Sequence, residues 1–113
     1  MSKSQSTITT LETAKQFFSA ISDNGDQLVV IDFYTTWCGP CKKIAPVMEE
    51  YSKKYPDVCF YKLDAENTEF KKICDACQIT AFPTFCFFKG TKCLKKLEGA
   101  NEVLLKEAIK AGM

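Results

Sequence analysis

The chain has 113 residues, of which 46% are hydrophobic and 26% charged, and its formal net charge is +1. This balance is typical of one compact globular domain over 1–113 with a core of its own. Because all 15 basic residues are lysines and histidine is absent, a Cys–His or Ser–His nucleophile and a bidentate arginine grip on phosphate are excluded. The nearly neutral charge gives no reason to expect binding to nucleic acid or to an anionic membrane.

The N-terminal segment and the cysteine content bear on the compartment. Residues 1–10 are polar, with neither the apolar run of a secretory signal nor the arginines of a transit peptide, and we expect 1–5 to be a flexible polar tail. No apolar run approaches the roughly 20 residues needed to cross a bilayer. We therefore expect a cytoplasmic protein, in which thiols are kept reduced. The seven cysteines are then redox-active, metal-binding or buried apolar residues, and not a disulfide framework.

The first predicted element is a helix. Thr9 with Glu12 fits a capping box, and the apolar residues behind it recur at helical spacing, which predicts a helix over 10–22. The Asn24-Gly25 pair indicates the turn that follows.

A strand–helix–strand unit follows. The short apolar runs 28–34 and 58–63 are typical of central strands covered on both faces. Between them, 38–54 has an apolar stripe at helical spacing, and Pro46 inside it predicts a kink. A right-handed crossover makes the two strands parallel.

The rest of the chain predicts a helix, a hairpin and a final helix. We expect a helix over 66–75 and then two β-type runs, 84–88 and 92–97, joined closely enough to form an antiparallel hairpin. Asn101 is the expected N-cap of a last helix that ends near 112. Together these elements predict an α/β fold, with a mixed sheet of parallel core and antiparallel C-terminal hairpin flanked by about four helices.

The junction between the 28–34 strand and its helix carries two cysteines, in the run Trp37-Cys38-Gly39-Pro40-Cys41. Gly39 permits a tight turn into the helix, and Pro40 suits the first helical turn. Cys38 then lies at the N-terminal end of the helix, where unpaired N–H groups and the positive dipole end stabilise a thiolate by about 0.3–2 kcal/mol. This lowers the thiol pKa from about 8.5 toward neutral pH, where attack on a disulfide is most efficient.

The same spacing indicates how the exchange proceeds. Cys38 attacks a substrate disulfide, and Cys41, one turn further along and less exposed, resolves the mixed disulfide. Cys41 must lose a proton, and no histidine is present to take it. Asp32, a carboxylate within an apolar strand, is the candidate proton acceptor, because burial raises the pKa of a carboxyl.

Two other classes of function remain open on the residues alone. Cys38, Cys41, Cys74 and Cys77 could form a structural zinc site, which would need four clustered sulfur ligands. A non-catalytic interaction module of the same fold is the other alternative, although such a module has no need for the two cysteines. Cys74 and Cys77 are either small buried apolar residues or a regulatory second disulfide.

At the level of motifs, the segment 31–42 resembles the active-site segment of the thioredoxin family. The segment 81–85 (Ala-Phe-Pro-Thr-Phe) resembles the cis-proline segment of that family, and Gly90 and Gly99 match its two usual glycines. The resemblance runs from about residue 6 to the end of the chain.

The resemblance implies a substrate-binding surface. Pro83 would be cis and pack against the cysteine pair, and the backbone of Phe82 would pair with an extended substrate segment by strand addition. The apolar docking surface would be lined by Trp37, Gly99 and Ala100.

The resemblance also implies the redox partners. Cys38 and Cys41 would alternate between a dithiol and a disulfide, and Lys62 would lie near Asp32 and tune its proton affinity. A flavoprotein thioredoxin reductase would supply electrons from NADPH, so the chain itself would bind no cofactor. It would act as a monomer on disulfide-containing proteins.

Overall fold

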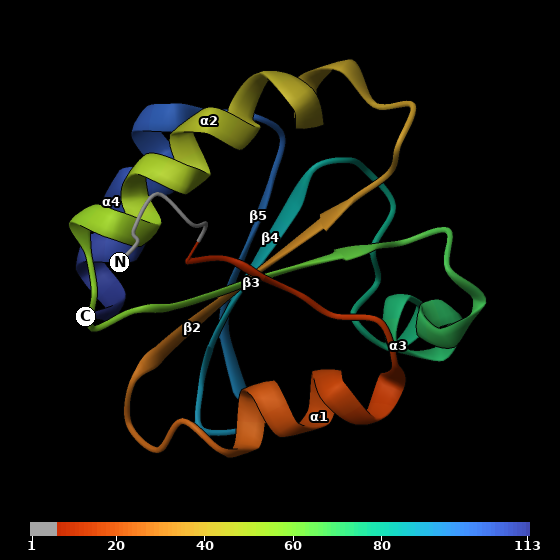
Figure 1. Ribbon diagram of the computed structural model, residues 1–113, viewed down its shortest axis with the longest axis horizontal. Helices are drawn as coiled ribbons and strands as arrows, with labels where there is room; N and C mark the ends of the chain where they lie inside the picture. Colours follow the sequence, from red (N-terminus) through yellow and green to blue (C-terminus); the bar gives the residue numbers. More distant parts are fainter. Residues whose placement is uncertain (1–6) are drawn as a thin grey trace, which may run out of the picture.

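A mixed five-stranded sheet organises residues 7–113, the part of the chain that the computed structural model describes (Figure 1). The predicted polar tail over 1–5 lies outside the described residues. The strands lie in the order β1-β3-β2-β4-β5, and their bounds are Thr9–Thr10, Leu28–Tyr34, Cys59–Asp64, Thr84–Lys89 and Lys92–Glu98 for β1 to β5. β1, β3 and β2 run parallel, while β2, β4 and β5 are antiparallel. This confirms the predicted parallel core and C-terminal hairpin.

Helices cover both faces of the sheet. Figure 1 shows α2 and α4 together on one side and α1 and α3 on the other. The helices are α1 (Ala14–Ser22), α2 (Gly39–Lys54), α3 (Lys71–Ala76) and α4 (Glu102–Gly112), and a short 3-10 turn, η1 (Thr68–Phe70), precedes α3. The single helix predicted over 66–75 is thus divided into η1 and α3.

The central strand β2 supplies side chains to both faces, because successive residues of a strand point in opposite directions. Leu28 and Val30 pack with the residues of α2 and α4. Val29, Ile31 and Phe33 pack with the residues of α1 and α3. By this alternation, Asp32 faces the side that α2 covers.

The first helix begins later than predicted. Thr13, and not Thr9, is its N-cap: the Thr13 hydroxyl accepts a hydrogen bond from the Gln16 N–H, and the Gln16 side chain accepts one from the Thr13 N–H. Thr9 belongs instead to β1, where it pairs with Tyr61 of β3. The prediction of a capping box at Thr9 was therefore wrong, because pairing with β3 holds this segment extended.

The spacing in the last helix also predicted an apolar face of Val103, Leu104, Ala108 and Ile109, which is right for Ala108 and Ile109 and wrong for the other two. Val103 is 64% and Leu104 is 44% exposed. The buried stripe of α4 consists of Leu105, Ala108 and Ile109, which recur at the spacing of one helix face. Asn101 is the N-cap, as predicted, and its side chain accepts from the Leu104 N–H at 3.0 Å.

The two edges of the sheet are β1 and β5. β1 has two residues. β5 is longer, but its residues are exposed except for Leu97, and they include Lys92, Lys95 and Lys96. No helix within residues 7–113 combines the length and the apolar character that a membrane span requires.

Candidate active site

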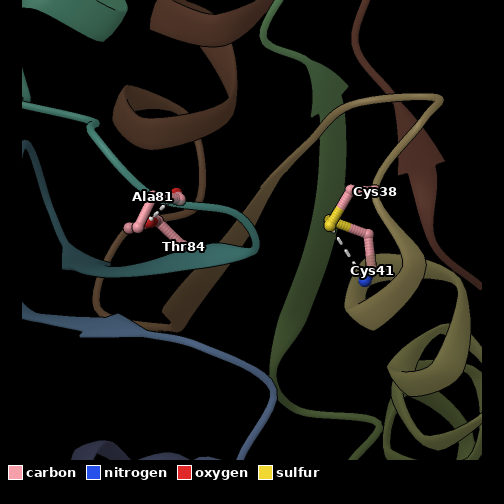
Figure 2. Close-up of a disulfide and its surroundings, with 4 residues drawn as sticks. All are labelled: Cys38, Cys41, Ala81 and Thr84. Atoms are coloured by element: carbon pink, nitrogen blue, oxygen red, sulfur yellow. Dashed lines mark hydrogen bonds between the residues drawn. A yellow bond between two sulfur atoms is a disulfide. The ribbon is translucent and has the colours of Figure 1, made fainter.

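The two cysteines of the 37–41 run lie where β2 passes into α2. Cys38 is the N-cap of α2, and its Sγ accepts a hydrogen bond from the backbone N–H of Cys41 at 3.1 Å. The two sulfur atoms are joined as a disulfide, and the Cα atoms are 5.3 Å apart (Figure 2). The start of the helix therefore brings the two sulfurs together and directs an N–H donor at the Cys38 sulfur, an arrangement that stabilises a thiolate there.

Both cysteines are buried in this disulfide form. Cys38 is 4% exposed and Cys41 is 6% exposed. The prediction that Cys41 is the less exposed of the two was wrong for this form. The reason is that the bond and the Cys41 N–H hold the Cys38 sulfur over the first turn of the helix.

Of the two residues between the cysteines, only Pro40 has the predicted local role. Pro40 lies in the first turn of α2, where its missing N–H leaves no hydrogen bond unmade. Gly39 has no positive φ, and a Cβ at this position would meet no atom within 4 Å. The turn into the helix therefore does not require glycine at this position.

Asp32 is a buried carboxylate at the centre of the sheet. It is 6% exposed, and its Oδ1 has no hydrogen-bond partner among the described residues. Burial raises its pKa from 3.8 to about 7, against the opposing charge of Lys62. Lys62 is the partner of Asp32 across the β2–β3 ladder. Asp32 therefore exchanges a proton near neutral pH.

Trp37 is the exposed aromatic residue beside the cysteines. Its side chain is 64% exposed, and its Nε1–H donates a hydrogen bond to Glu66 Oε2 at 2.8 Å. The Phe82 ring meets the Trp37 ring edge to face, with centroids 6.2 Å apart. The two rings give the site an apolar rim that remains open to a partner.

The 81–85 segment has the backbone geometry that the resemblance implies. The Phe82–Pro83 peptide bond is cis, and the Thr84 hydroxyl donates to the Ala81 carbonyl at 2.6 Å (Figure 2). Gly99, with φ of +93°, donates its N–H to the Pro83 carbonyl at 2.8 Å. Because a side chain is strained at this φ, the contact between Gly99 and the cis-proline segment requires glycine.

Glu66 was not predicted as a site residue from the sequence. It follows the end of β3 and lies in a polar turn, where an acidic residue is common and carries no signal of its own. Only the folded chain brings it to the indole of Trp37.

The four-cysteine zinc site is not formed. Cys38 and Cys41 lie at the start of α2, whereas Cys74 and Cys77 pack with the cluster on the α1 and α3 side of the sheet. Across residues 7–113, no group of three or more His, Cys, Asp or Glu side chains is placed to hold a metal ion.

Comparison with known proteins agrees with this geometry. Residues 8–111 match the thioredoxin family. The chain belongs to this family. Thioredoxin-1 of Saccharomyces cerevisiae is 46% identical over 104 residues, which cover 92% of this chain and 97% of that protein. The X-ray structure of Fasciola hepatica thioredoxin has a TM-score of 0.87 at 37% identity and covers 93% of this chain and 99% of its own.

A third relative comes from a complex. The structure described as a complex of ferredoxin:thioredoxin reductase and thioredoxin f2 contains a chain with a TM-score of 0.86 at 39% identity, covering 92% of this chain and 93% of its own. Thioredoxins interact with reductases and with disulfide-containing substrates. The present chain is a thiol–disulfide oxidoreductase that reduces protein disulfides. Such exchange takes place between sulfur atoms and needs no bound cofactor.

Proposed function

We propose that Cys38 is the nucleophile of this thioredoxin and that Cys41 is the resolving cysteine. The Cys38 thiolate attacks one sulfur of a substrate disulfide, a Cys38–substrate disulfide forms, and the other substrate sulfur leaves as a thiolate. Cys41 then attacks the Cys38 sulfur, and the substrate leaves fully reduced. The two electrons now lie on the substrate, and Cys38 and Cys41 are joined as a disulfide.

Asp32 is the proton acceptor for the second attack. Cys41 must be a thiolate to attack, and Asp32 faces the side of the sheet that carries α2. With its pKa raised to about 7 by burial, Asp32 is ionised in a large fraction of molecules near neutral pH and can take the proton. Lys62 keeps this pKa from rising further, so it tunes the proton affinity of Asp32.

The substrate docks on the exposed rim of the cysteine pair. Trp37 and Phe82 offer aromatic surface, and the backbone at Phe82 pairs with an extended substrate segment. Gly99 and Ala100 complete the surface. The hydrogen bond from the Gly99 N–H to the Pro83 carbonyl holds them beside the 81–85 segment.

The electrons come from NADPH through a flavoprotein thioredoxin reductase, and the protein works as a monomer in the cytoplasm. A reducing compartment suits the cysteines: in the described part of the chain, Cys59, Cys74, Cys77, Cys86 and Cys93 are free thiols. In an oxidising compartment such thiols would be open to wrong pairing.

The observation that carries the proposal is a disulfide at the start of a helix on the same side of the sheet as a buried carboxylate. The test is reduction of a disulfide-bonded protein, followed by NADPH consumption in the presence of a flavoprotein thioredoxin reductase. We expect consumption that requires all three components. Reduction of the substrate only with a ferredoxin-dependent reductase would reject the NADPH route, and no reduction with a chemical dithiol as donor would reject the reductase function itself.

A further inference from the structure

A second group of cysteines lies on the opposite face of the sheet from Cys38 and Cys41. Cys77 is the C-cap of α3, and Cys86 lies in β4 with its side chain in the cluster on the α1 and α3 side. Cys77 packs against the same cluster, and its interaction with Cys86 is the largest influence on the pKa of Cys77. The end of α3 and the strand β4 therefore bring these two thiols close together on one face of the sheet.

The environment of this pair favours a thiolate on Cys77. Hydrogen bonding with Cys86 lowers the pKa of Cys77. Burial raises this pKa, and the nearby positive charge of Lys96 lowers it. Lys96 is the cross-strand partner of Cys86. Its Nζ also donates to the carbonyls of Cys77 and Gln78, at 3.3 and 2.9 Å, which places the ammonium group beside the end of α3.

Cys74 differs from Cys77 although it lies on the same short helix. Burial, then the neighbouring charges of Cys77 and Asp75, raise the pKa of Cys74 to about 11. At neutral pH Cys74 is therefore a protonated, weakly reactive thiol. The three-residue spacing suggested a bond between Cys74 and Cys77, but the contacts favour Cys86 as the partner of Cys77.

The two sulfurs differ in access. Cys86 is 1% exposed, whereas Cys77 is partly exposed and lines an open groove of about 980 Å³ between α1 and α3. A small oxidant can therefore reach Cys77, while Cys86 is shielded from it. This is the arrangement of an attacking thiol with a resolving thiol behind it.

We propose that Cys77 and Cys86 form a second redox-active dithiol, in which Cys77 reacts with hydrogen peroxide and Cys86 closes a disulfide between the end of α3 and β4.

The chemistry needs one peroxide molecule. The Cys77 thiolate attacks one peroxide oxygen, the O–O bond breaks, and the hydroxide that leaves takes up a proton to give water. Cys77 is thereby oxidised to a sulfenic acid. The Cys86 sulfur then attacks the Cys77 sulfur, the S–O bond breaks, and the departing hydroxide leaves as water with the Cys86 proton. Two thiols and one peroxide thus give one disulfide and two water molecules.

The bond would close a ring around the cis-proline segment. The residues between Cys77 and Cys86 are 78–85, which include Phe82 and Pro83. Oxidation would tie both ends of this segment to each other and restrict its motion. An effect on substrate docking rests on the proposed function, whereas the bond itself does not.

The test uses the full chain with Cys38→Ser and Cys41→Ser, so that the first dithiol cannot exchange with other thiols. The protein is treated with hydrogen peroxide, free thiols are blocked, and disulfides are mapped by mass spectrometry. Trypsin leaves Cys74, Cys77 and Cys86 in one peptide, because no lysine separates them. Further cleavage before Asp75 and after Phe85 separates all three. We expect the Cys77 fragment to stay linked to the Cys86 fragment until a reductant is added.

Two variants in the same background act as controls. Cys74→Ser should retain the link, and Cys86→Ala should lose it and accumulate sulfinic acid at Cys77. A link between Cys74 and Cys77, or overoxidation of Cys77 without a link in the parent protein, would overturn the proposal. Because the mapping of the parent needs no substitution at the pair itself, a folding defect of Cys86→Ala leaves the test intact.

A second measurement tests whether the Cys77–Cys86 disulfide restricts the motion of residues 78–85. Amide hydrogen exchange over 78–85 should slow in the linked form relative to the same protein after reduction. Unchanged exchange would overturn the constraint on the cis-proline segment. This readout does not depend on catalysis, so its failure is distinct from a failure of the reductase function.

Discussion

The indole of Trp37 is tied to Glu66 by a hydrogen bond of 2.8 Å from Nε1–H to Oε2. Trp37 otherwise stands out in solvent and meets Phe82 edge to face. Glu66 therefore sets the direction of the exposed ring, although it lies on the other side of the β2–β3 crossover. In the proposed docking mode Glu66 would be a positioning residue, which orients the aromatic surface that the substrate contacts.

Glu66→Gln should weaken the hydrogen bond to Trp37 and leave the fold intact. An exposed hydrogen bond to a charged group is worth about 1 kcal/mol, so kcat/KM for a protein substrate should fall by about fivefold. Most of the loss should appear in KM, because the chemistry at the cysteines is unchanged. Glu107→Gln on α4 is the matched control, and an equal effect in both variants would reject the positioning role.

Cys41→Ser should accumulate stable mixed disulfides with substrate proteins, whereas Cys38→Ser should form none. The reason is that only the attacking sulfur bonds to the substrate, and the bond persists when the second sulfur is absent. Non-reducing electrophoresis after incubation with a disulfide-bonded protein measures the result. The opposite pattern would reverse the two roles.

Asp32→Asn should slow the resolving step by about 100-fold, the usual contribution of a positioned proton acceptor. The wild-type rate should rise with pH through about 7, the pKa to which burial raises Asp32, and this rise should disappear in the variant. Asp57→Asn, at an exposed carboxylate, is the control. A wild-type rate that does not respond to pH near 7 would remove Asp32 from the mechanism.

Lys62→Met should move the same inflection to higher pH. The charge of Lys62 lowers the pKa of Asp32. Without this charge, burial should raise the pKa of Asp32 further. The displacement is read from the pH dependence of single-turnover reduction. If the inflection stays in place or moves to lower pH, Lys62 does not tune Asp32.

Asp32 should also make the stability of the protein depend on pH. Its folded pKa, about 7, lies above the unfolded value of 3.8, so the folded state holds the proton more tightly. The associated stability is fully present below about pH 4 and is lost as the pH rises through about 7. The full loss is on the order of 4 kcal/mol, since the carboxylate must then be ionised while buried.

Asp32→Asn removes this dependence, because an amide does not ionise in this range. The difference in unfolding free energy between variant and wild type should therefore shift in favour of the variant between pH 4 and pH 8. Denaturant unfolding at several pH values measures it. A difference that is constant with pH would show that the carboxyl titrates alike in both states.

Local patterns in the sequence predicted most of the sheet. The runs at β2, β3 and β4 were found because each is rich in strand-forming residues, and β5 was found because it follows β4 after a gap short enough for a hairpin. β1 was missed, since a pair of threonines becomes a strand only by hydrogen bonding to β3, which follows much later in the chain. The start of α1 was misplaced for the same reason, because two capping boxes compete in the sequence and the sheet decides between them.

The site divides in the same way. Cys38, Cys41 and Asp32 could be found from spacing and from one charge in an apolar run. Contacts that form only on folding could not be predicted. Glu66 accepts a hydrogen bond from Trp37, and Cys86 lies near Cys77, although the members of each pair belong to separate elements. The three-residue spacing of Cys74 and Cys77 suggested a pair on one helix, because spacing along a short helix gives no information about the residues of the neighbouring strand.

The edges of the sheet bear on where other chains can add. β1 is too short to serve as a template for a further strand, and β5 presents a row of lysines that would repel the same strand of a second copy. Backbone pairing with another polypeptide is thereby discouraged along both flanks. In the proposed docking mode, an incoming extended substrate would pair instead with the backbone around the cis-proline, and the lysines of β5 would disfavour assembly of two copies through this edge.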